Sequence, residues 1–187
     1  SQILEFDMPK RPVYLWTLPL FHCNGWCFAW TIAARGGVNV CLRKFDPKTC
    51  FDLIRQERVD YYCAAPVVHA ALANAAAELK QGIEHEVNGM IAGAAPPEAV
   101  LARMEEMGFN ITHVYGLTEV YGPSAGCVEQ PEWADLSTED RAMKKARQGM
   151  RYTLQSGFTV LSPETMEPVP ADGQTFGELM FRGNIVM

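Results

Sequence analysis

Short apolar runs alternate with helical segments along most of the chain, and the links between them are short. The runs rich in β-branched and aromatic residues are 13–20, 38–42, 59–63, 90–92 and 111–115, and the segments with helical spacing are 25–34, 46–58, 67–80 and 96–107. Apolar runs separated by helices are typical of a sheet that is covered on both faces. Because a helical crossover returns the chain in the same direction, consecutive strands lie parallel. We therefore predict an α/β fold, with a mostly parallel sheet and helices on both faces.

The pattern changes after residue 127. Residues 128–150 are polar and charged, and Ser137 stands three residues before Asp140, which is the spacing of a helix capping box. From residue 151 onward the sequence has the pattern of strands and turns. We predict an α/β subdomain over 1–127, a polar helical excursion over 128–150 and the start of a β-rich subdomain over 151–187. Both ends of the chain have the character of cut ends, so we expect an internal fragment of a longer enzyme.

Composition argues against several classes of protein. The 187 residues include 16 Lys and Arg against 22 Asp and Glu, a net charge of −6, whereas a nucleic-acid-binding protein would show a basic stripe. Hydrophobic residues make up 48% of the chain, which is too much for a disordered protein. The apolar stretch 13–34 contains Pro19, His22, Asn24 and Gly25, so we predict no membrane span. The six cysteines form no CxxC pair, which favours reduced thiols in a cytoplasmic protein.

The stretch His113-Val-Tyr-Gly-Leu-Thr-Glu119 carries the clearest chemical signal, because it runs from a predicted strand into a loop. Ligands of such sheets bind beyond the carboxyl ends of the strands. Gly116 lets the backbone approach a ligand closely, and the flat ring of Tyr115 suits a purine. The Thr118 hydroxyl can donate to a phosphate oxygen, and Glu119 is a hard oxygen ligand for Mg²⁺. Taken alone, these residues also fit an ordinary strand end followed by a turn.

Four segments of the chain occur together in the order of one known family. They are Leu18-Pro-Leu-Phe-His-Cys-Asn-Gly-Trp26, Ile91-Ala-Gly-Ala-Ala-Pro-Pro97, Tyr115-Gly-Leu-Thr-Glu119 and Gly177-Glu-Leu-Met-Phe-Arg-Gly183. In that order they resemble the acyl-site segment, the adenine-binding turn, the core motif and a β-subdomain strand of the adenylate-forming (AMP-binding) superfamily. Within the acyl-CoA synthetase branch, the amino-acid sequence of residues 21–26 is most similar to that of medium-chain and methylmercaptopropionate ligases.

The resemblance implies roles for the matching residues. Thr118, Glu119 and His22 would form the catalytic set, with Thr118 at the α-phosphate of ATP, Glu119 as the Mg²⁺ ligand and His22 near the reacting carboxylate. The residues that would contact the nucleotide are Gly93, Ala94, Ala95, Pro96, Tyr115, Gly116 and Thr118, with the Tyr115 ring stacked on adenine. His22, Trp26 and Gly93 would line the acyl pocket.

The remaining histidines have weaker expectations. His69 and His85 are expected to be ordinary surface or helix residues. His113 stands two residues before Tyr115, so both side chains are expected on the same face of the sheet. A direct role of His113 in the site stays open.

The same resemblance implies a reaction. A carboxylic acid would attack ATP to give acyl-AMP and pyrophosphate, and coenzyme A would then displace AMP. The expected ligands are ATP, Mg²⁺, coenzyme A and a short- or medium-chain fatty or related acid, as in fatty acid metabolism. The intact enzyme would be a cytoplasmic acid–thiol ligase, with a homodimer as the expected assembly. Residues 1–187 lack the family's phosphate loop, ribose-binding Asp and C-terminal catalytic Lys, so we expect the isolated chain to be inactive or nearly so.

Three other interpretations stay open. Gly122-Pro-Ser-Ala-Gly126 fits the nucleophile elbow of a serine hydrolase with Ser124 as nucleophile, although all four histidines precede it. His22, Cys23 and Cys27 offer three zinc ligands, although no second paired cluster accompanies them. A non-catalytic module that binds a nucleotide or an acyl group would need the adenine turn and Thr118 but no phosphate loop.

Overall fold

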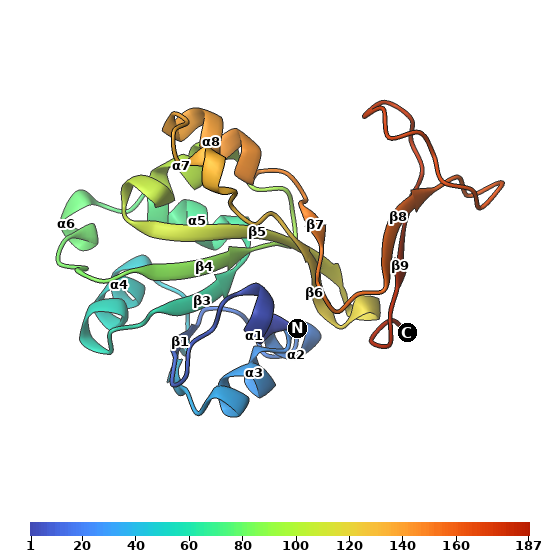
Figure 1. The fold of residues 1–187 in the computed structure, drawn as a ribbon. Coiled ribbons are helices and arrows are strands. Elements are labelled where there is room, and N and C mark those ends of the chain that lie inside the picture. The colour runs from blue at the N-terminus through green and yellow to red at the C-terminus, as the bar shows by residue number, and fades with distance from the viewer.

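A seven-stranded sheet forms the centre of the protein in the computed structural model, which describes residues 1–187 (Figure 1). From one edge to the other, its strands are β2 (Val38–Cys41), β1 (Val13–Trp16), β3 (Tyr61–Ala64), β4 (Val87–Ile91), β5 (Phe109–Leu117), β6 (Gly122–Gly126) and β7 (Met150–Arg151). The strands from β1 to β5 pair in parallel, and β6 and β7 are added antiparallel. The predicted mostly parallel sheet is confirmed.

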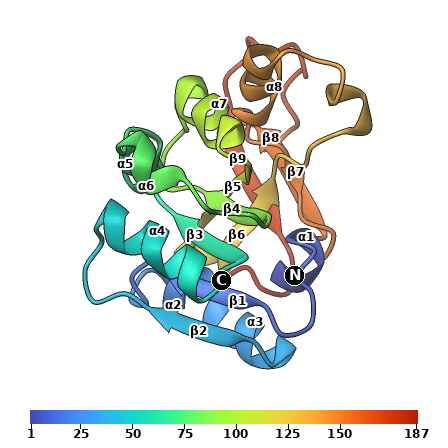
Figure 2. The same ribbon diagram turned by 90° about the vertical axis from the view of Figure 1, so that its left-hand side faces the viewer.

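Helices cover both faces of the sheet, as predicted (Figures 1 and 2). One face carries α1 (Gln2–Glu5) and α3 (Phe28–Arg35), and the other carries α4 (Pro47–Gln56), α5 (Pro66–Ala73), α7 (Glu98–Glu106) and α8 (Thr138–Lys145). The short helices α2 (Cys23–Trp26) and α6 (Ala77–Lys80) and the 3-10 turns η1 (Thr118–Val120) and η2 (Pro131–Trp133) lie in the connections. None of these helices has the length and apolar character that spanning a bilayer requires.

The two faces of the sheet build two hydrophobic cores. Along β3, Tyr62 and Ala64 join a core of 18 buried residues on the four-helix face, whereas Tyr61 and Cys63 join a core of 12 on the opposite face. This division follows from strand geometry, in which neighbouring side chains point to opposite faces. Burial on both faces explains why the parallel strands have uninterrupted apolar sequences.

Helix α4 begins where the sequence indicates. Asp46 Oδ2 accepts a hydrogen bond from the backbone N of Thr49 at 2.8 Å, and Pro47 takes the first helical position. The same hydrogen bond lowers the pKa of Asp46. The capping residue Asp46 therefore marks the point where the connection 42–45 after β2 gives way to helix α4.

The polar segment 128–150 is docked onto the α/β unit. Helix α8 packs along α7, and its Ala142 is only 1% exposed within the larger core. Lys145 is 5% exposed, with its Nζ 2.7 Å from a carboxylate oxygen of Glu129 and 3.4 Å from one of Glu105. Strand β7 then extends the main sheet beside β6. The boundaries at residues 127 and 150 stay predictions.

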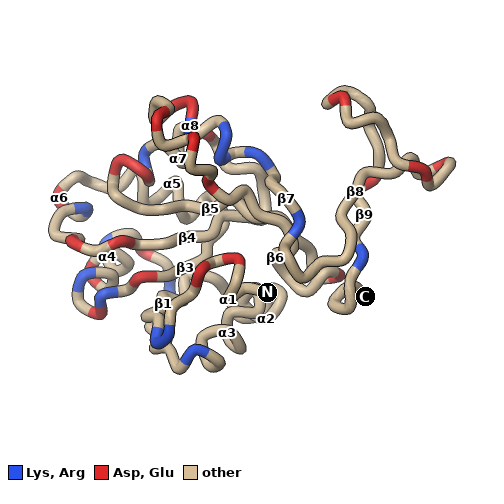
Figure 3. Tube along the Cα trace, in the orientation of Figure 1, with Lys and Arg blue, Asp and Glu red and all other residues tan.

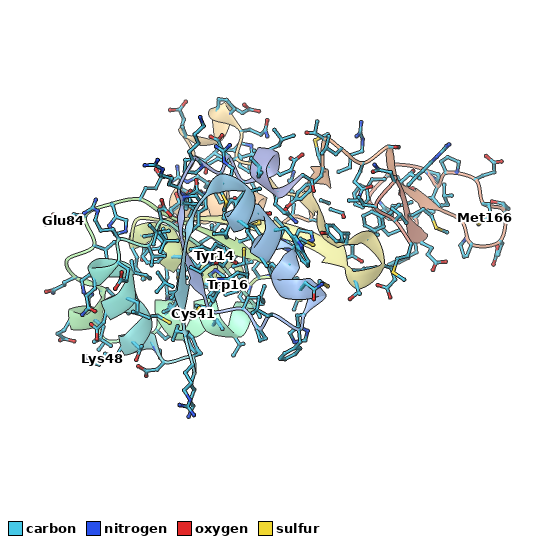
Figure 4. All side chains as sticks on the ribbon, turned by 90° about the horizontal axis from the view of Figure 1, so that it is seen from below. Tyr14, Trp16, Cys41, Lys48, Glu84 and Met166 are labelled. Carbon is cyan, nitrogen blue, oxygen red and sulfur yellow. The ribbon has the colours of Figure 1, made fainter.

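Strands β8 (Gly157–Leu161) and β9 (Glu178–Arg182) form a separate antiparallel pair that stands apart from the main sheet in Figure 1. Two antiparallel strands near the end of the chain are thus confirmed, although the first begins at Gly157 instead of Tyr152. Tyr152 stays with the main unit because it is buried in the smaller core and its backbone N donates to the carbonyl oxygen of Ser124 at 2.8 Å. Figure 4 places Met166 at the far tip of the loop between β8 and β9.

Of the two expectations for His69, a helix residue is confirmed and a surface residue is wrong. It lies on α5, and its ring is wholly buried and tilted against Tyr62, with the ring centroids 5.3 Å apart. Burial lowers the pKa of His69 from 6.5 to about 4. The ring is therefore neutral in the folded protein at neutral pH.

Acidification should destabilise the protein through His69. Between pH 6.5 and 4 the unfolded chain binds a proton at this ring that the folded chain does not, so the free energy of unfolding falls as the pH falls. We expect a loss of about 2 kcal/mol between pH 7 and pH 5 from this residue. Urea unfolding across that range measures it.

The test variant for this measurement is His69→Gln. It should flatten the pH dependence relative to wild type. His113, whose pKa is also lowered by burial, adds a contribution of the same sign to both proteins. An unchanged slope in His69→Gln would contradict the buried, neutral state.

Candidate functional site

The loops that follow β1, β4 and β5 meet at the carboxyl edge of the sheet. They contain the segments 17–27, 92–97 and 118–121. Parallel strands end together at this edge, and ligands of open α/β sheets bind there. The topology therefore brings together the three segments that resemble the acyl-site, adenine and core motifs.

The residues from Cys23 to Cys27 form a left-handed turn. Their φ angles are 44°, 48°, 61°, 52° and 68° in order, and the regular helix α3 begins only at Phe28. The helix predicted over 25–34 is therefore wrong in its first turn. A left-handed residue other than glycine costs about 1–2 kcal/mol, so packing must hold the turn. Gly25 is its tightest point, since a Cβ there would lie 2.5 Å from the ring of Trp16.

The turn brings Trp26 to a cavity of about 60 Å³ at the sheet edge. The cavity is lined by Cys23, Trp26, Ala92, Gly93, Gly116, Gly122 and Pro123. Three predicted site residues, Trp26, Gly93 and Gly116, therefore lie together although they come from three loops. A Cβ on Gly93 would meet no atom within 4 Å, which leaves open space beside this residue.

Thr118 and Glu119 lie directly after β5, in η1. The Thr118 side chain is exposed, and its Oγ1 lies 3.2 Å from Sγ of Cys23. Glu119 is exposed and forms no ion pair, and its backbone carbonyl accepts a hydrogen bond from N of Met187 at 2.9 Å. Both side chains are thus accessible to a ligand beside the cavity that Cys23 lines.

Tyr115 stacks on a ring of the second sheet. Its ring centroid lies 6.1 Å from that of Phe181 on β9, with the planes at 9°. A β-bulge follows Tyr115, and Gly116 then passes so close to Gly122 that a Cβ would lie 1.8 Å from the Gly122 carbonyl oxygen. One face of the Tyr115 ring is therefore covered, and a purine would stack on the other face or take the place of Phe181.

The other predicted site residues share this edge of the sheet without lining the cavity. His22 is exposed ahead of the left-handed turn, and its ring centroid lies 4.5 Å from that of Phe21. Ala94 and Ala95 are exposed after β4, whereas Pro96 is buried. The roles of these residues stay predictions.

His113 contributes to packing. It is 2% exposed, and its Nδ1 lies 2.7 Å from the carbonyl oxygen of Arg147. Burial lowers the pKa of His113, which favours the neutral ring. His113 therefore connects β5 to the segment before β7.

Ser124 does not occupy a nucleophile elbow. It lies inside β6, is fully buried and donates a hydrogen bond to the carbonyl oxygen of Val120 at 2.9 Å. Its own oxygen accepts a hydrogen bond from Nε2 of Gln155 at 3.0 Å. Because the elbow needs an exposed serine on a sharp turn from a strand into a helix, the hydrolase interpretation is wrong.

The zinc interpretation also lacks support in the geometry. No group of three or more His, Cys, Asp and Glu side chains that could hold a metal ion occurs in the structure. Cys27 instead donates to the carbonyl oxygen of Tyr121 at 3.0 Å.

Cys23 and Gly122 line the cavity although the sequence suggested other roles for them. From the sequence, Cys23 belongs to the acyl-site segment but has an individual role only as a zinc ligand, and Gly122 has one only in a hydrolase motif. The signal that could have indicated them is position, because Cys23 follows His22 in the acyl-site segment and Gly122 lies three residues after Glu119.

A groove runs along the carboxyl ends of β1 and β2. Its apolar part is lined by Trp16, Leu18, Pro19, Leu20, Ala29, Asn39, Cys41 and Leu42, and its basic part by Cys41, Leu42, Arg43, Lys44, Thr49 and Leu53. The two parts share Cys41 and Leu42, and Figure 4 shows Trp16 close to Cys41. Over the rest of the molecule, Lys and Arg lie interspersed with Asp and Glu, without a continuous basic stripe (Figure 3).

Comparison with known proteins decides the family. The family model described as AMP-binding enzyme matches residues 1–187. The chain belongs to the AMP-binding enzyme family. The resemblance inferred from the four motifs is therefore confirmed.

Relatives of this AMP-binding chain include plant CoA ligases. It is 48% identical over 188 residues to a peroxisomal acetate/butyrate–CoA ligase of Arabidopsis thaliana and 49% identical over 188 residues to an acetate–CoA ligase of Humulus lupulus. Each alignment covers 100% of this chain and 33% of the relative, so the chain spans about a third of the length of these relatives.

A solved structure with the same fold is the o-succinylbenzoate–CoA synthetase of Bacillus subtilis in complex with ATP and magnesium ion. It superimposes with a TM-score of 0.81 at 20% identity, and the match covers 100% of this chain and 36% of that chain. The expected α/β class is therefore confirmed, because the chain shares the fold of this synthetase over the matched part.

Proposed function

We propose that the protein is an ATP-dependent acyl-CoA synthetase that forms an acyl-adenylate and then an acyl-CoA. One observation carries the proposal: Trp26, Gly93 and Gly116 line one cavity, and Cys23 of that cavity contacts Thr118. An acyl group and the α-phosphate of ATP would therefore lie next to each other. Holding the two reactants in contact removes much of the entropic barrier to their reaction.

Thr118 and Glu119 are suited to the phosphates of ATP. The Thr118 hydroxyl can donate to an α-phosphate oxygen where negative charge collects during attack by the carboxylate. Mg²⁺ in nucleotide sites is usually held by one or two carboxylates together with phosphates and waters, so the single exposed carboxylate of Glu119 fits this ion. When bound, Mg²⁺ would neutralise charge on the phosphates.

Tyr115 and the turn after β4 would hold the adenine. The partly exposed Tyr115 ring, which stacks on Phe181, offers a flat surface, and Gly93, Ala94 and Ala95 are exposed with side chains no larger than methyl. A flat base can approach such a backbone closely.

Calorimetry with ATP, AMP and Mg²⁺ tests nucleotide binding to this chain directly, beside Thr118→Ala. Binding that Thr118→Ala weakens supports the proposal. Binding to the full-length protein without pyrophosphate exchange would favour the alternative of a non-catalytic nucleotide- or acyl-binding module. No binding to either protein would contradict both interpretations.

A short carboxylic acid is the proposed acyl substrate. The cavity is small, with a volume of about 60 Å³, and Trp26 forms part of its wall. Two relatives are named for acetate and butyrate, which supports the same size range. The resemblance of residues 21–26 to medium-chain ligases suggested medium-chain acids, but these would need a longer cavity.

Changing the cavity walls should shift the chain-length preference. Trp26→Ala in the full-length protein should raise the rate with hexanoate relative to acetate by about tenfold, because it lengthens the space for methylene groups. Gly93→Trp should have the opposite effect, since its side chain would fill the open space beside Gly93. Pyrophosphate exchange with a series of acids measures both changes. Unaltered profiles would count against this placement of the acyl group.

Coenzyme A would bind along the groove beside β1 and β2. Arg43 and Lys44 supply positive charge for its phosphates, and the apolar part of the groove, which includes Leu20 two residues before His22, would take the pantetheine arm. We expect Lys44→Gln to raise KM for coenzyme A by about fivefold and to leave KM for ATP unchanged. Steady-state kinetics of the full-length protein check this, with Lys10→Gln as an exposed control. Equal changes in both KM values would contradict the assignment.

The wider biological setting stays a prediction. A cytoplasmic location, a homodimer and a role in fatty acid metabolism rest on family resemblance and composition. The relative from Arabidopsis thaliana is named peroxisomal, so fractionation of cells should compare both compartments.

A further inference from the structure

Two thiols from the left-handed turn contact the turn η1. Sγ of Cys23 lies 3.2 Å from Oγ1 of Thr118, and Sγ of Cys27 donates to the carbonyl oxygen of Tyr121 at 3.0 Å. Gly122, the residue after Tyr121, also lies close to the left-handed turn, because a Cβ there would lie 3.4 Å from Sγ of Cys27 and 3.5 Å from Cα of Trp26. The left-handed turn therefore contacts Thr118, the first residue of η1, and Tyr121, the residue that follows η1.

The Cys23 contact bears on the protons that Thr118 can offer. A threonine hydroxyl has one proton to donate and two lone pairs to accept with. Cys23 is the side-chain partner of Thr118 Oγ1 in the structure. If the Cys23 thiol donates, the Thr118 proton stays available for a phosphate oxygen, and the rotation of the hydroxyl is restricted.

We propose that Cys23 is a positioning residue for Thr118, which donates its S–H to Thr118 Oγ1 and directs the Thr118 proton toward the α-phosphate. This inference rests on the proposed adenylation function. Cys23 would couple the acyl-binding turn to the phosphate-binding turn, because the same side chain also lines the acyl cavity. In this proposal, the left-handed turn Cys23–Cys27 positions the Cys23 thiol against Thr118.

The six cysteines differ in solvent exposure, so the reactivity of Cys23 can be measured separately. All are free, Cys41 is exposed, Cys23 is partly exposed, and Cys27, Cys50, Cys63 and Cys127 are buried. Burial raises the pKa of Cys27 to about 11, so its thiol stays protonated and donates to Tyr121. Cys41 is therefore the exposed thiol that must be removed before Cys23 is labelled.

A double-mutant cycle in the full-length protein tests the inference. Cys23→Ala should lower kcat for pyrophosphate exchange by about tenfold with KM for ATP within twofold, and Cys23→Ser, which restores a donor, should stay within about threefold of wild type. In a Thr118→Ala background, Cys23→Ala should have no further effect. Effects of Cys23→Ala and Thr118→Ala that multiply, or a Cys23→Ser as slow as Cys23→Ala, would overturn the proposal.

A second measurement does not depend on catalysis. In a Cys41→Ala background, N-ethylmaleimide should label Cys23 about threefold faster when Thr118→Val removes the hydroxyl partner, as followed by mass spectrometry. Equal labelling rates would show that the thiol does not bond to Thr118, and would overturn the inference while leaving the proposed function intact. If wild type shows no exchange with any short acid, the proposed function fails, and the labelling rates alone decide whether Cys23 holds Thr118.

Discussion

Replacing Glu119 by Gln should lower the rate of adenylation by about 100- to 1,000-fold. Gln preserves the size and shape of the side chain but removes the negative charge that Mg²⁺ prefers in its ligands. Because Glu119 is exposed and forms no ion pair, the variant should keep the melting temperature of the wild type. The measurement is pyrophosphate exchange by the full-length protein across a Mg²⁺ titration, in which a large excess of Mg²⁺ should restore part of the rate.

Glu57→Gln is the matched control for Glu119→Gln. Glu57 is also exposed, but it follows α4 and leads into the opposite edge of the sheet, so its loss should change neither the rate nor the Mg²⁺ dependence. Unchanged exchange in Glu119→Gln would remove this residue from the metal site. A rate loss that excess Mg²⁺ does not reduce at all would point to a role other than metal binding.

The sheet could be predicted from the sequence because its strands are buried on both faces. Every residue of β3, from Tyr61 to Ala64, is buried, so the strand has a continuous apolar sequence bounded by Pro66. The cap at Asp46 and the glycine at the end of α3 are local signals of the same kind. Local sequence and tertiary structure agree at these positions, as they do in most of a foldable chain.

The left-handed turn could not be predicted in this way. A run of five left-handed residues has no propensity signal, and four of the five are not glycine. What selects it is the contact of Gly25 with Trp16, nine residues earlier, and the contacts of two thiols with Thr118 and Tyr121, more than 90 residues later. For the same reason the role of Cys23 became visible only in three dimensions.

The burial of His69 and Lys145 also could not be predicted from the sequence. His69 is buried because α5 packs against Tyr62, and Lys145 is buried because Glu129 and Glu105 provide carboxylates beside it. Polar composition alone predicts solvent exposure in both cases. Each exception depends on a partner that other elements supply.

Gly116→Ala should destabilise the protein by about 3 kcal/mol or more and should abolish nucleotide binding. Its new Cβ would lie 1.8 Å from the carbonyl oxygen of Gly122 and 2.7 Å from Cα of Pro123. These are backbone atoms that no change of rotamer can move, so β6 would have to separate from β5. That separation would displace Thr118, which follows two residues after Gly116, and would distort the cavity that both glycines line.

Gly108→Ala is the control variant for Gly116→Ala. It measures the general effect of replacing a glycine at a position where the added Cβ meets no other atom. Gly108 has a φ of 79° and nothing within 4 Å of an added Cβ, so the change should cost only about 1 kcal/mol through backbone strain. Urea unfolding of both variants, with calorimetric titration of ATP, compares the two effects. A Gly116→Ala that is no less stable than Gly108→Ala would contradict the close pairing of β5 and β6. A Gly116→Ala that is destabilised but still binds ATP normally would instead place the nucleotide away from this cavity, because the same atoms cannot both shift and leave the site unchanged.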